Sequence, residues 1–390
     1  MIYNFDEIID RRHTNCYKYD RSLEIFGTED VLPMWVADMD FRTPDFIFEA
    51  IRSRSEHPIL GYTMLPENYF TVVADWVYSL HQWKVEENWM GFLPGIVPGL
   101  SFAVQSFTAE GDEVIIQPPV YHPFIHVVEK NNRTLVYNPL KELDGRFEMD
   151  FEDLERKITP KTKLLILCNP HNPGGRVWSR ETLIRLADIC AAHNITVISD
   201  EIHSDMALRN CKHVPFASVS DKAAEISVTF MAPSKTFNMP ALITSYYIAP
   251  NAGLRKKFAG FLFKNELTAG NIFAYQATMA VYRHGDEWRR QMLDYVQGNI
   301  DYVVDYLKNN IPQIKPMIPE ASFLVFLDCK NLGLAPEDVP AFFIKKAGLG
   351  LNDGRMFGPG GEQHMRMNVG CPRSIVVNAM ENLKKAVGEL

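Results

Sequence analysis

The sequence predicts an α/β fold with a mostly parallel sheet flanked by helices, followed by a smaller α+β domain. Between about residues 90 and 250, short apolar runs end in polar or Pro/Gly turns, and a segment at 180–193 has apolar residues at helical spacing. Continuous apolar strands separated by helices indicate a parallel sheet that is buried on both faces. Ligands of such sheets bind beyond the carboxyl ends of the strands. The predicted strands are 113–117, 163–168, 195–199 and 226–230.

The final third of the chain has a different pattern, which predicts the smaller domain. Its expected elements are a long helix (286–310), a strand (323–328), a helix near 336–347, a Gly-rich turn (357–361) and a strand (364–369). Pro336 suits the first turn of the second helix. We therefore expect an N-terminal arm that forms part of the small domain (1–50), a large α/β domain (51–285) and a C-terminal small domain (286–390).

Composition and charge exclude several classes of protein. The chain is 46% hydrophobic and 23% charged, which is ordinary for a globular protein, and its net charge of −8 disfavours a broad surface for nucleic acid. The first twenty residues are charged throughout, unlike a secretory signal, and no apolar stretch reaches the length that spans a bilayer. The six cysteines form no CxxC pair, which favours reduced thiols. We expect a cytoplasmic protein that binds neither nucleic acid nor membrane.

The first unusual polar segment follows the predicted strand that ends at Cys168. It is Asn169-Pro-His-Asn-Pro-Gly-Gly175, and its two Asn-Pro steps favour an extended, rigid turn. A single Asn-Pro step would be explained as a strand terminator. The repeated step at a carboxyl strand end instead favours a ligand site to which Asn172 presents its amide.

The second segment is Ser199-Asp-Glu-Ile-His203, after a fully apolar strand. A carboxylate at Asp200 would be costly there without a partner. Asp200 could cap a helix, and His203 alone would be explained as a core histidine. The functional interpretation is that Asp200 meets a cationic ring nitrogen at the edge of the sheet.

The third segment is Ala232-Pro-Ser-Lys-Thr-Phe-Asn238, after the strand that ends near Phe230. Lysines are usually solvated, but Lys235 lies between Pro233 and Phe237, where loss of hydration would lower its pKa. These conditions suit a lysine that forms a Schiff base. Asn, Asp and Lys on successive strand ends are the groups that a pyridine-aldehyde cofactor requires near its phenolate oxygen, its ring nitrogen and its aldehyde.

Other candidate sites have weaker support. His122 and His126 have i,i+4 spacing, but Pro123 disfavours a helix there and no carboxylate partner is evident, so we expect no metal site. The sequence has no G-x-x-x-x-G-K-[ST] or G-x-G-x-x-G segment, which disfavours a nucleotide cofactor. The Gly-rich segment 357–361 is typical of a turn rather than of a phosphate cradle.

Over essentially its whole length, the chain resembles fold type I pyridoxal-5′-phosphate (PLP) enzymes of the class I/II aminotransferase superfamily. Within that superfamily it is most similar to the MalY/PatB-type cystathionine β-lyases. The resemblance implies a PLP-dependent transferase fold of type I. It rests on the segments 4–12, 32–41, 61–63, 115–124, 165–173, 198–204, 232–238 and 370–374.

The resemblance implies a role for each residue around the cofactor ring. Lys235 would hold the aldehyde, and Asp200 would pair with the pyridinium nitrogen. Asn172 and His203 would lie near the ring O3′, and Tyr121 would stack on the ring.

The resemblance also implies how the phosphate is held. The turn Gly95, Ile96 and Val97, ahead of a helix, would offer backbone N–H groups, a placement that helix-terminus electrostatics also favours. Ser234 would add a hydroxyl, and Tyr62 would reach the phosphate of a neighbouring subunit. A homodimer with shared active sites is therefore expected.

For the substrate, the resemblance implies that Arg366 clamps the α-carboxylate and that Val36 lines the pocket. The sequence departs from the family pattern at 172–175 and at 238–242, and the second change would reshape the wall beside Lys235. Many aminotransferases have a phosphate-binding arginine where this chain has Ile243. The lyases lack it too, which favours a lyase.

We therefore expect a carbon–sulfur β-lyase that converts L-cystathionine or cysteine-like thioethers to pyruvate, ammonia and a thiol such as homocysteine. An aminotransferase would use the same residues and stays an alternative. A regulatory protein with a PLP fold is the alternative from another class.

Overall fold

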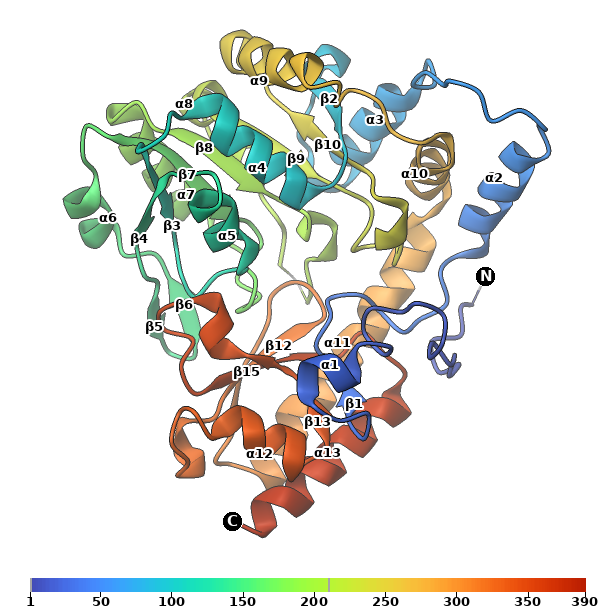
Figure 1. Cartoon of the computed structure of the whole chain (residues 1–390), viewed down its shortest axis with the longest axis vertical. Coiled ribbons are helices and arrows are strands. Elements are labelled where there is room, and N and C mark those ends of the chain that lie inside the picture. Colours follow the sequence, from blue (N-terminus) through green and yellow to red (C-terminus); the bar gives the residue numbers. More distant parts are fainter. Residues whose placement is uncertain (1, 210) are drawn as a thin grey trace.

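The computed structural model describes residues 2–209 and 211–390. These residues form a seven-stranded sheet in the order β2-β10-β9-β8-β7-β3-β4 (Figure 1). Strand β10 is antiparallel to both neighbours, and the other pairs are parallel, which confirms the predicted mostly parallel sheet. The strands are β2 (Met90–Leu93), β3 (Glu113–Ile116), β4 (Thr134–Tyr137), β7 (Thr162–Cys168), β8 (Thr196–Asp200), β9 (Ser227–Met231) and β10 (Ser245–Ile248).

The central strands are apolar along their length because both faces of the sheet are covered. Along β7, Leu164 and Ile166 pack on one side with helices α4, α5 and α9. Leu165 and Leu167 pack on the other side with α7 and α8. This alternation follows from the two-residue period of a strand. The helices are α4 (Ile96–Phe107), α5 (Pro123–Glu129), α7 (Arg180–Ala192), α8 (Asp221–Ile226) and α9 (Ala252–Lys264).

A second layer of helices covers the β2–β10 edge of the sheet. Met90, Phe92 and Tyr246 join a cluster that includes Val73 of α3 and Tyr275 of α10. Between β4 and β7 in the chain come a hairpin and a short helix, at the other edge of the sheet (Figure 1). The elements are α2 (Asp45–Ser55), α3 (Tyr69–His81), α10 (Ile272–His284), α6 (Phe151–Lys157), β5 (Lys141–Leu143) and β6 (Arg146–Glu148).

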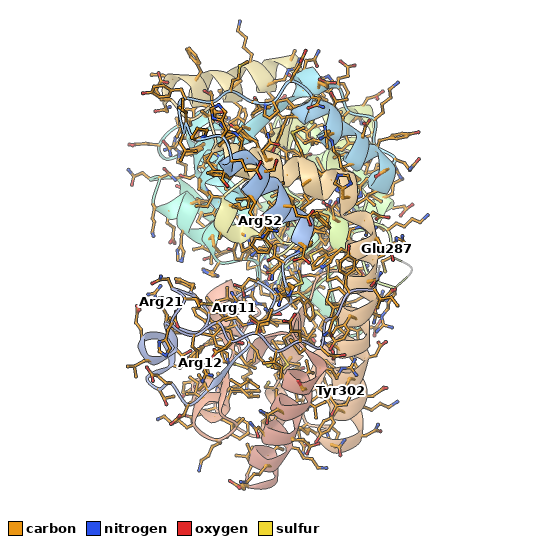
Figure 2. The ribbon with its side chains drawn as sticks, turned by 90° about the vertical axis from the view of Figure 1, so that its right-hand side faces the viewer. Arg11, Arg12, Arg21, Arg52, Glu287 and Tyr302 are labelled. Carbon is orange, nitrogen blue, oxygen red and sulfur yellow. The ribbon has the colours of Figure 1, made fainter. Side chains whose placement is uncertain are left out.

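The C-terminal third forms a four-stranded antiparallel sheet in the order β11-β12-β15-β14. The long helix predicted at 286–310 is confirmed as α11, which extends from Glu287 near the large sheet to Tyr302 beside the small one (Figure 2). The elements are α11 (Asp286–Asn310), β11 (Lys315–Met317), β12 (Leu324–Asp328), α12 (Val339–Lys345), β13 (Leu349–Gly350), β14 (Asn352–Asp353), β15 (His364–Asn368) and α13 (Arg373–Gly388).

The N-terminal arm packs against this smaller sheet (Figures 1 and 2). Strand β1 (Leu32–Pro33) pairs in parallel with β13, and helix α1 (Ser22–Phe26) lies beside it. We propose that the arm and residues 286–390 form one small domain, with 51–285 as the large domain, because α10 ends at His284 and α11 begins at Asp286.

Two local expectations were wrong. Pro123 does not disfavour a helix: it is at the start of α5, where a missing N–H costs nothing. Helix α12 begins at Val339, so the proline of its first turn is Pro340 and not Pro336. Among the described helices, none has the length and apolar character needed to cross a membrane.

Candidate active site

A cavity of about 250 Å³ opens at the carboxyl ends of the central strands. Asn172 follows β7, Asp200 ends β8, and Lys235 follows β9. Because these strands are parallel neighbours, their carboxyl ends meet at one edge of the sheet. The predicted site residues that line the cavity are Gly95, Ile96, Val97, Tyr121, Asn172, Asp200, His203, Ser234 and Lys235.

Lys235 is partly buried at the floor of the cavity. Its Nζ donates a hydrogen bond of 2.6 Å to the carbonyl oxygen of Ala37, a partner that the sequence did not suggest. Removal from water lowers the pKa of Lys235 to about 8, with Asp38 acting in the opposite direction. The lowered pKa increases the fraction of this amine that is uncharged near neutral pH, which is the form that a nucleophile or base requires.

Asp200 is 3% exposed, and its carboxylate accepts the N–H of Ile202 at 3.1 Å. Burial raises the pKa of Asp200 to about 7. The neighbouring Glu201 carboxylate is bound elsewhere, to Ser199 and His213. Asp200 thus offers a desolvated carboxylate that a cation in the cavity would stabilise in its charged form, and a pyridinium nitrogen is such a cation.

His203 is also buried, and burial lowers its pKa to about 3, so its imidazole is neutral. Within the described part of the chain its Nδ1 has no hydrogen-bond partner. A buried nitrogen without a partner is costly unless a ligand satisfies it. Together with the amide of Asn172, His203 therefore suits the polar ring substituent of PLP.

The opposite wall of the cavity is suited to a phosphate. Gly95 has a φ of 104°, a conformation that side chains rarely adopt, and it places the first turn of α4 at the cavity. The first backbone N–H groups of a helix have no partner within it and attract anions. Ile96 and Val97 supply these groups, and the Ser234 hydroxyl lies at the same cavity. The residues present therefore fit PLP at each of its polar ends.

The segment after Lys235 forms another wall of the cavity. Pro240–Leu242 make a short 3₁₀ turn, and Ile243 follows with a φ of 48°. Pro240, Ile243 and Thr244 line the cavity. The departure from the family pattern at 238–242 therefore adjoins the cavity, and an apolar side chain occupies the place of the missing arginine.

Arg366 lies on β15 of the small sheet and is buried. One guanidinium nitrogen donates to Asn172 Oδ1 at 2.9 Å, and the other donates to Asn352 Oδ1 at 2.6 Å and to the Trp35 carbonyl at 2.9 Å. Burial lowers the pKa of Arg366 to about 10. No described carboxylate contacts it, so Arg366 is a buried cation that is held in place by neutral groups. A substrate carboxylate would supply the missing charge.

Three predicted residues are not among those that line this cavity. Arg366 adjoins the cavity through its hydrogen bond to Asn172, and the other two are Val36 and Tyr62. Val36 lines an adjoining cavity of about 690 Å³, whose wall also includes Lys235. Tyr62 is fully exposed (113%). The single chain therefore does not bring Tyr62 into its own site.

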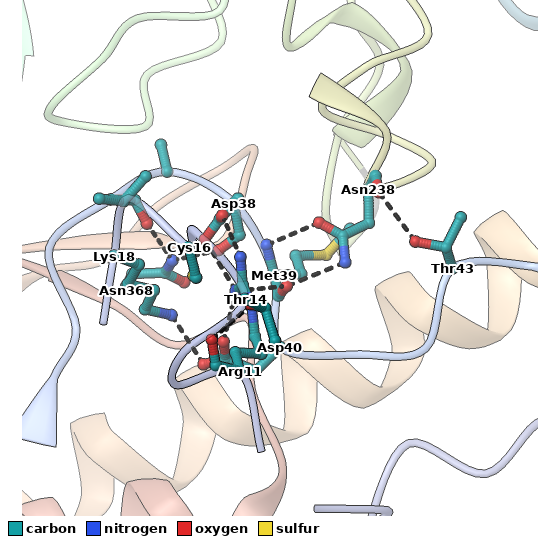
Figure 3. Close-up of polar contacts among 12 residues, drawn as sticks. Arg11, Thr14, Cys16, Lys18, Asp38, Met39, Asp40, Thr43, Asn238 and Asn368 are labelled. Carbon is teal, nitrogen blue, oxygen red and sulfur yellow. Dashed lines mark hydrogen bonds and ion pairs between the residues drawn. The ribbon is translucent and has the colours of Figure 1, made fainter. Parts of the chain in front are cut away.

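A polar network that the sequence pattern did not indicate fixes residues 36–41 (Figure 3). The Ala37 carbonyl oxygen of this segment accepts the hydrogen bond from Lys235. Arg11 forms ion pairs of 2.6 Å with both Asp38 and Asp40, and the buried Lys18 lies 2.7 Å from Asp40. The alternating acids of the run Trp35-Val-Ala-Asp-Met-Asp40 were a signal. Their basic partners, Arg11 and Lys18, are about twenty or more residues away in the sequence, so no short-range spacing pattern indicated these ion pairs.

Two asparagines complete this network from other parts of the chain. The Asn238 amide bonds to the backbone of Met39 and Phe41, which ties the lysine-bearing loop to the arm (Figure 3). The Asn368 amide donates to the carbonyl oxygens of Val36 and Asp38. The arm segment above Lys235 is thus fixed to both sheets.

The fold and the cavity define a class of enzyme. Residues 34–383 match the family described as aminotransferase class I and II. The chain belongs to this family and is a PLP-dependent enzyme.

Named relatives narrow the comparison. The chain is 46% identical to cystathionine beta-lyase PatB of Bacillus subtilis (strain 168), over 98% of this chain and 100% of the relative. The PLP-bound C–S lyase from Staphylococcus hominis has a TM-score of 0.91 at 34% identity, over 99% of this chain and 98% of the other. A PLP-bound putative aminotransferase from Clostridium difficile 630 has a TM-score of 0.96 at 40% identity, over 99% of this chain and 100% of the other. The expected family and cofactor are confirmed.

Proposed function

We propose that this chain is a carbon–sulfur β-lyase that acts on L-cystathionine or a similar cysteine thioether. With cystathionine, water is consumed, and homocysteine, pyruvate and ammonia are released. The likeness to cystathionine beta-lyase PatB supports this reaction class. The observation that carries it is the 46% identity to that lyase over 98% of this chain. Lys235, which lines the cavity, is placed to act as the base in this reaction.

Three residues in or beside the cavity, Arg366, Asp200 and Lys235, have proposed tasks in this reaction. Arg366 binds the substrate α-carboxylate, and its bonds to Asn172 and Asn352 fix the orientation of its two donor nitrogens. PLP, when bound, withdraws electrons from the substrate Cα and stabilises the charge that develops there. Asp200 keeps the ring nitrogen of the cofactor protonated. Lys235 then takes the Cα proton as a general base.

The adjoining cavity of about 690 Å³ offers space for the thiol that leaves the substrate. It is lined by Val36, Ala37 and Met39 of the arm and by Lys235 and Pro240. The wall also carries charged side chains such as Arg11 and Asp38, so it offers both apolar and polar contacts to a thioether chain that ends in an amino-acid group. The side chain of the substrate would extend from the site of Lys235 into this space.

An aminotransferase is the second candidate, because the chain is 40% identical to a protein described as a putative aminotransferase. One assay separates the two: purified enzyme is given cystathionine with and without a keto-acid acceptor. A lyase releases pyruvate and thiol in equal amounts without the acceptor. Turnover that requires the acceptor would refute the lyase assignment.

We further propose that the enzyme is a cytoplasmic homodimer with shared active sites. Tyr62 is fully exposed in the single chain, and the apolar residues Ile59, Leu60 and Met64 around it are largely exposed as well. A second copy of the chain would bury this segment, and Tyr62 would then reach the cofactor phosphate of that second copy. The six cysteines are unpaired, which is compatible with a reducing compartment.

A further inference from the structure

Away from the active site, three side chains that are distant in sequence converge between the two sheets. Asp328 of β12 and His364 of β15 are directly opposite each other in the small sheet. Glu142 lies on β5, in the hairpin that lies near the small sheet (Figure 1), and its carboxylate is close to both of them. One potential ligand atom from each residue lies within 4.8 Å of the other two. Sequence spacing gave no sign of this cluster, because its members lie on separate elements.

The ring of His364 is held in one orientation. It stacks on Phe326 with 4.7 Å between centroids and 4° between planes, and its side chain is 1% exposed. The Nδ1 atom lies 2.9 Å from the Glu362 carbonyl oxygen, so Nδ1 carries the hydrogen and donates it. The tautomer leaves a lone pair on Nε2. Metal-bound histidines are commonly fixed by the same bond from the other ring nitrogen to a carbonyl.

The Nε2 atom has no hydrogen-bond partner among the described residues. It faces Glu142 Oε2 at 3.9 Å, so a lone pair opposes a carboxylate oxygen. Two acceptors in this arrangement leave a position between them that a cation can fill. The nearby cation is Lys330, whose Nζ is 3.0 Å from Glu142 and 3.8 Å from Asp328. Lys330 is 45% exposed, so its flexible side chain can move into solvent.

We propose that Glu142, Asp328 and His364 form a binding site for a divalent transition-metal ion of the Zn²⁺ type, which displaces the ammonium of Lys330. One imidazole and two carboxylates are accepted Zn²⁺ ligands, and water can fill the fourth position. Ions such as Mg²⁺ prefer oxygen ligands and are disfavoured by the imidazole. The bound ion joins the hairpin of the large-sheet side to β15, the strand that carries Arg366 two residues after His364.

The test titrates the holoenzyme with Zn²⁺ alone, in buffer without chelators, and measures binding by calorimetry. The wild type should bind one ion at this site. Glu142→Gln removes a charged ligand from a partly exposed position and should weaken that binding at least about tenfold. Glu155→Gln, an exposed acid on α6, is the matched control and should leave the affinity unchanged. Mg²⁺ should not compete.

Lys330→Met gives a result of opposite sign, because it removes the competing cation. It should tighten Zn²⁺ binding by about two- to fivefold, since an exposed ion pair is weak. His364→Gln should abolish Zn²⁺ binding. If that variant does not fold, the Glu142→Gln and Lys330→Met variants still test the proposal. The proposal is wrong if the wild type shows no saturable Zn²⁺ binding, or if Glu142→Gln and Lys330→Met bind Zn²⁺ as the wild type does.

Discussion

Replacing Asp200 with asparagine should stabilise the protein once the cofactor has been removed. Burial raises the pKa of Asp200 from 3.8 to about 7, so folding disfavours its charged form. Each pKa unit corresponds to about 1.36 kcal/mol, and the shift therefore amounts to a penalty on the order of 4 kcal/mol in the cofactor-free protein. Asparagine has the same shape, keeps an acceptor for the Ile202 N–H and carries no charge.

The penalty depends on pH with a definite sign. A carboxyl whose pKa is raised by folding costs nothing below its unfolded pKa of 3.8, where both states are protonated. The cost grows as pH rises and levels off above about 7, where both states are ionised. The Asp200→Asn gain should therefore be clearly smaller at pH 5 than at pH 8, where it should be on the order of 4 kcal/mol.

The assay is urea unfolding of cofactor-free wild type and Asp200→Asn at pH 5 and pH 8. Asp294→Asn, an exposed acid on α11, is the control and should change stability by less than about 0.5 kcal/mol. The same Asp200 variant should bind PLP more weakly than the wild type, since the ring nitrogen loses its counterion. An Asp200→Asn protein that is no more stable than wild type at pH 8, or whose gain is equal at both pH values, would refute the reasoning.

Three further predictions concern the neighbouring groups. Arg366→Lys should weaken substrate binding about ten- to a hundredfold, because one point charge replaces two parallel donors, and should change PLP affinity much less; equal losses would contradict the clamp role. Mixing Tyr62→Phe chains with Lys235→Ala chains should restore tight PLP binding, because one site of the mixed dimer then has both native residues. A mixed dimer of wild type with a chain that carries both changes should have no site with both native residues. If the first mixture restores no tight binding, Tyr62 serves its own subunit. Asn238→Ala should cost about 1–3 kcal/mol of unfolding free energy, measured in urea, by freeing buried backbone groups of Met39 and Phe41; an unchanged midpoint would show that this amide does not hold the arm.

The sheet and much of the cavity could be predicted because their signals are local. Strand β7 is an unbroken apolar run, and the polar residue at each carboxyl strand end stands out against it. Parallel pairing then dictates that Asn172, Asp200 and Lys235 converge. Helix α5 was missed because Pro123 was judged as a helix breaker, although a proline at the first position is favourable.

Contacts between distant segments could not be predicted in this way. The hydrogen bond from Lys235 to Ala37 and the ion pairs of Arg11 with Asp38 and Asp40 depend on how the arm crosses the large sheet. No periodicity in the sequence specifies that path. The same holds for the support that Asn352 gives to Arg366 across adjacent strands.

The most direct test of the account is to locate the covalent attachment of the cofactor. The purified enzyme is reduced with sodium borohydride, digested, and mapped by mass spectrometry, with Lys235→Ala as the control. The account predicts that the visible PLP absorbance disappears and that the reduced adduct is on Lys235, while Lys235→Ala folds but retains no covalent cofactor. A reduced adduct on any other lysine would contradict it.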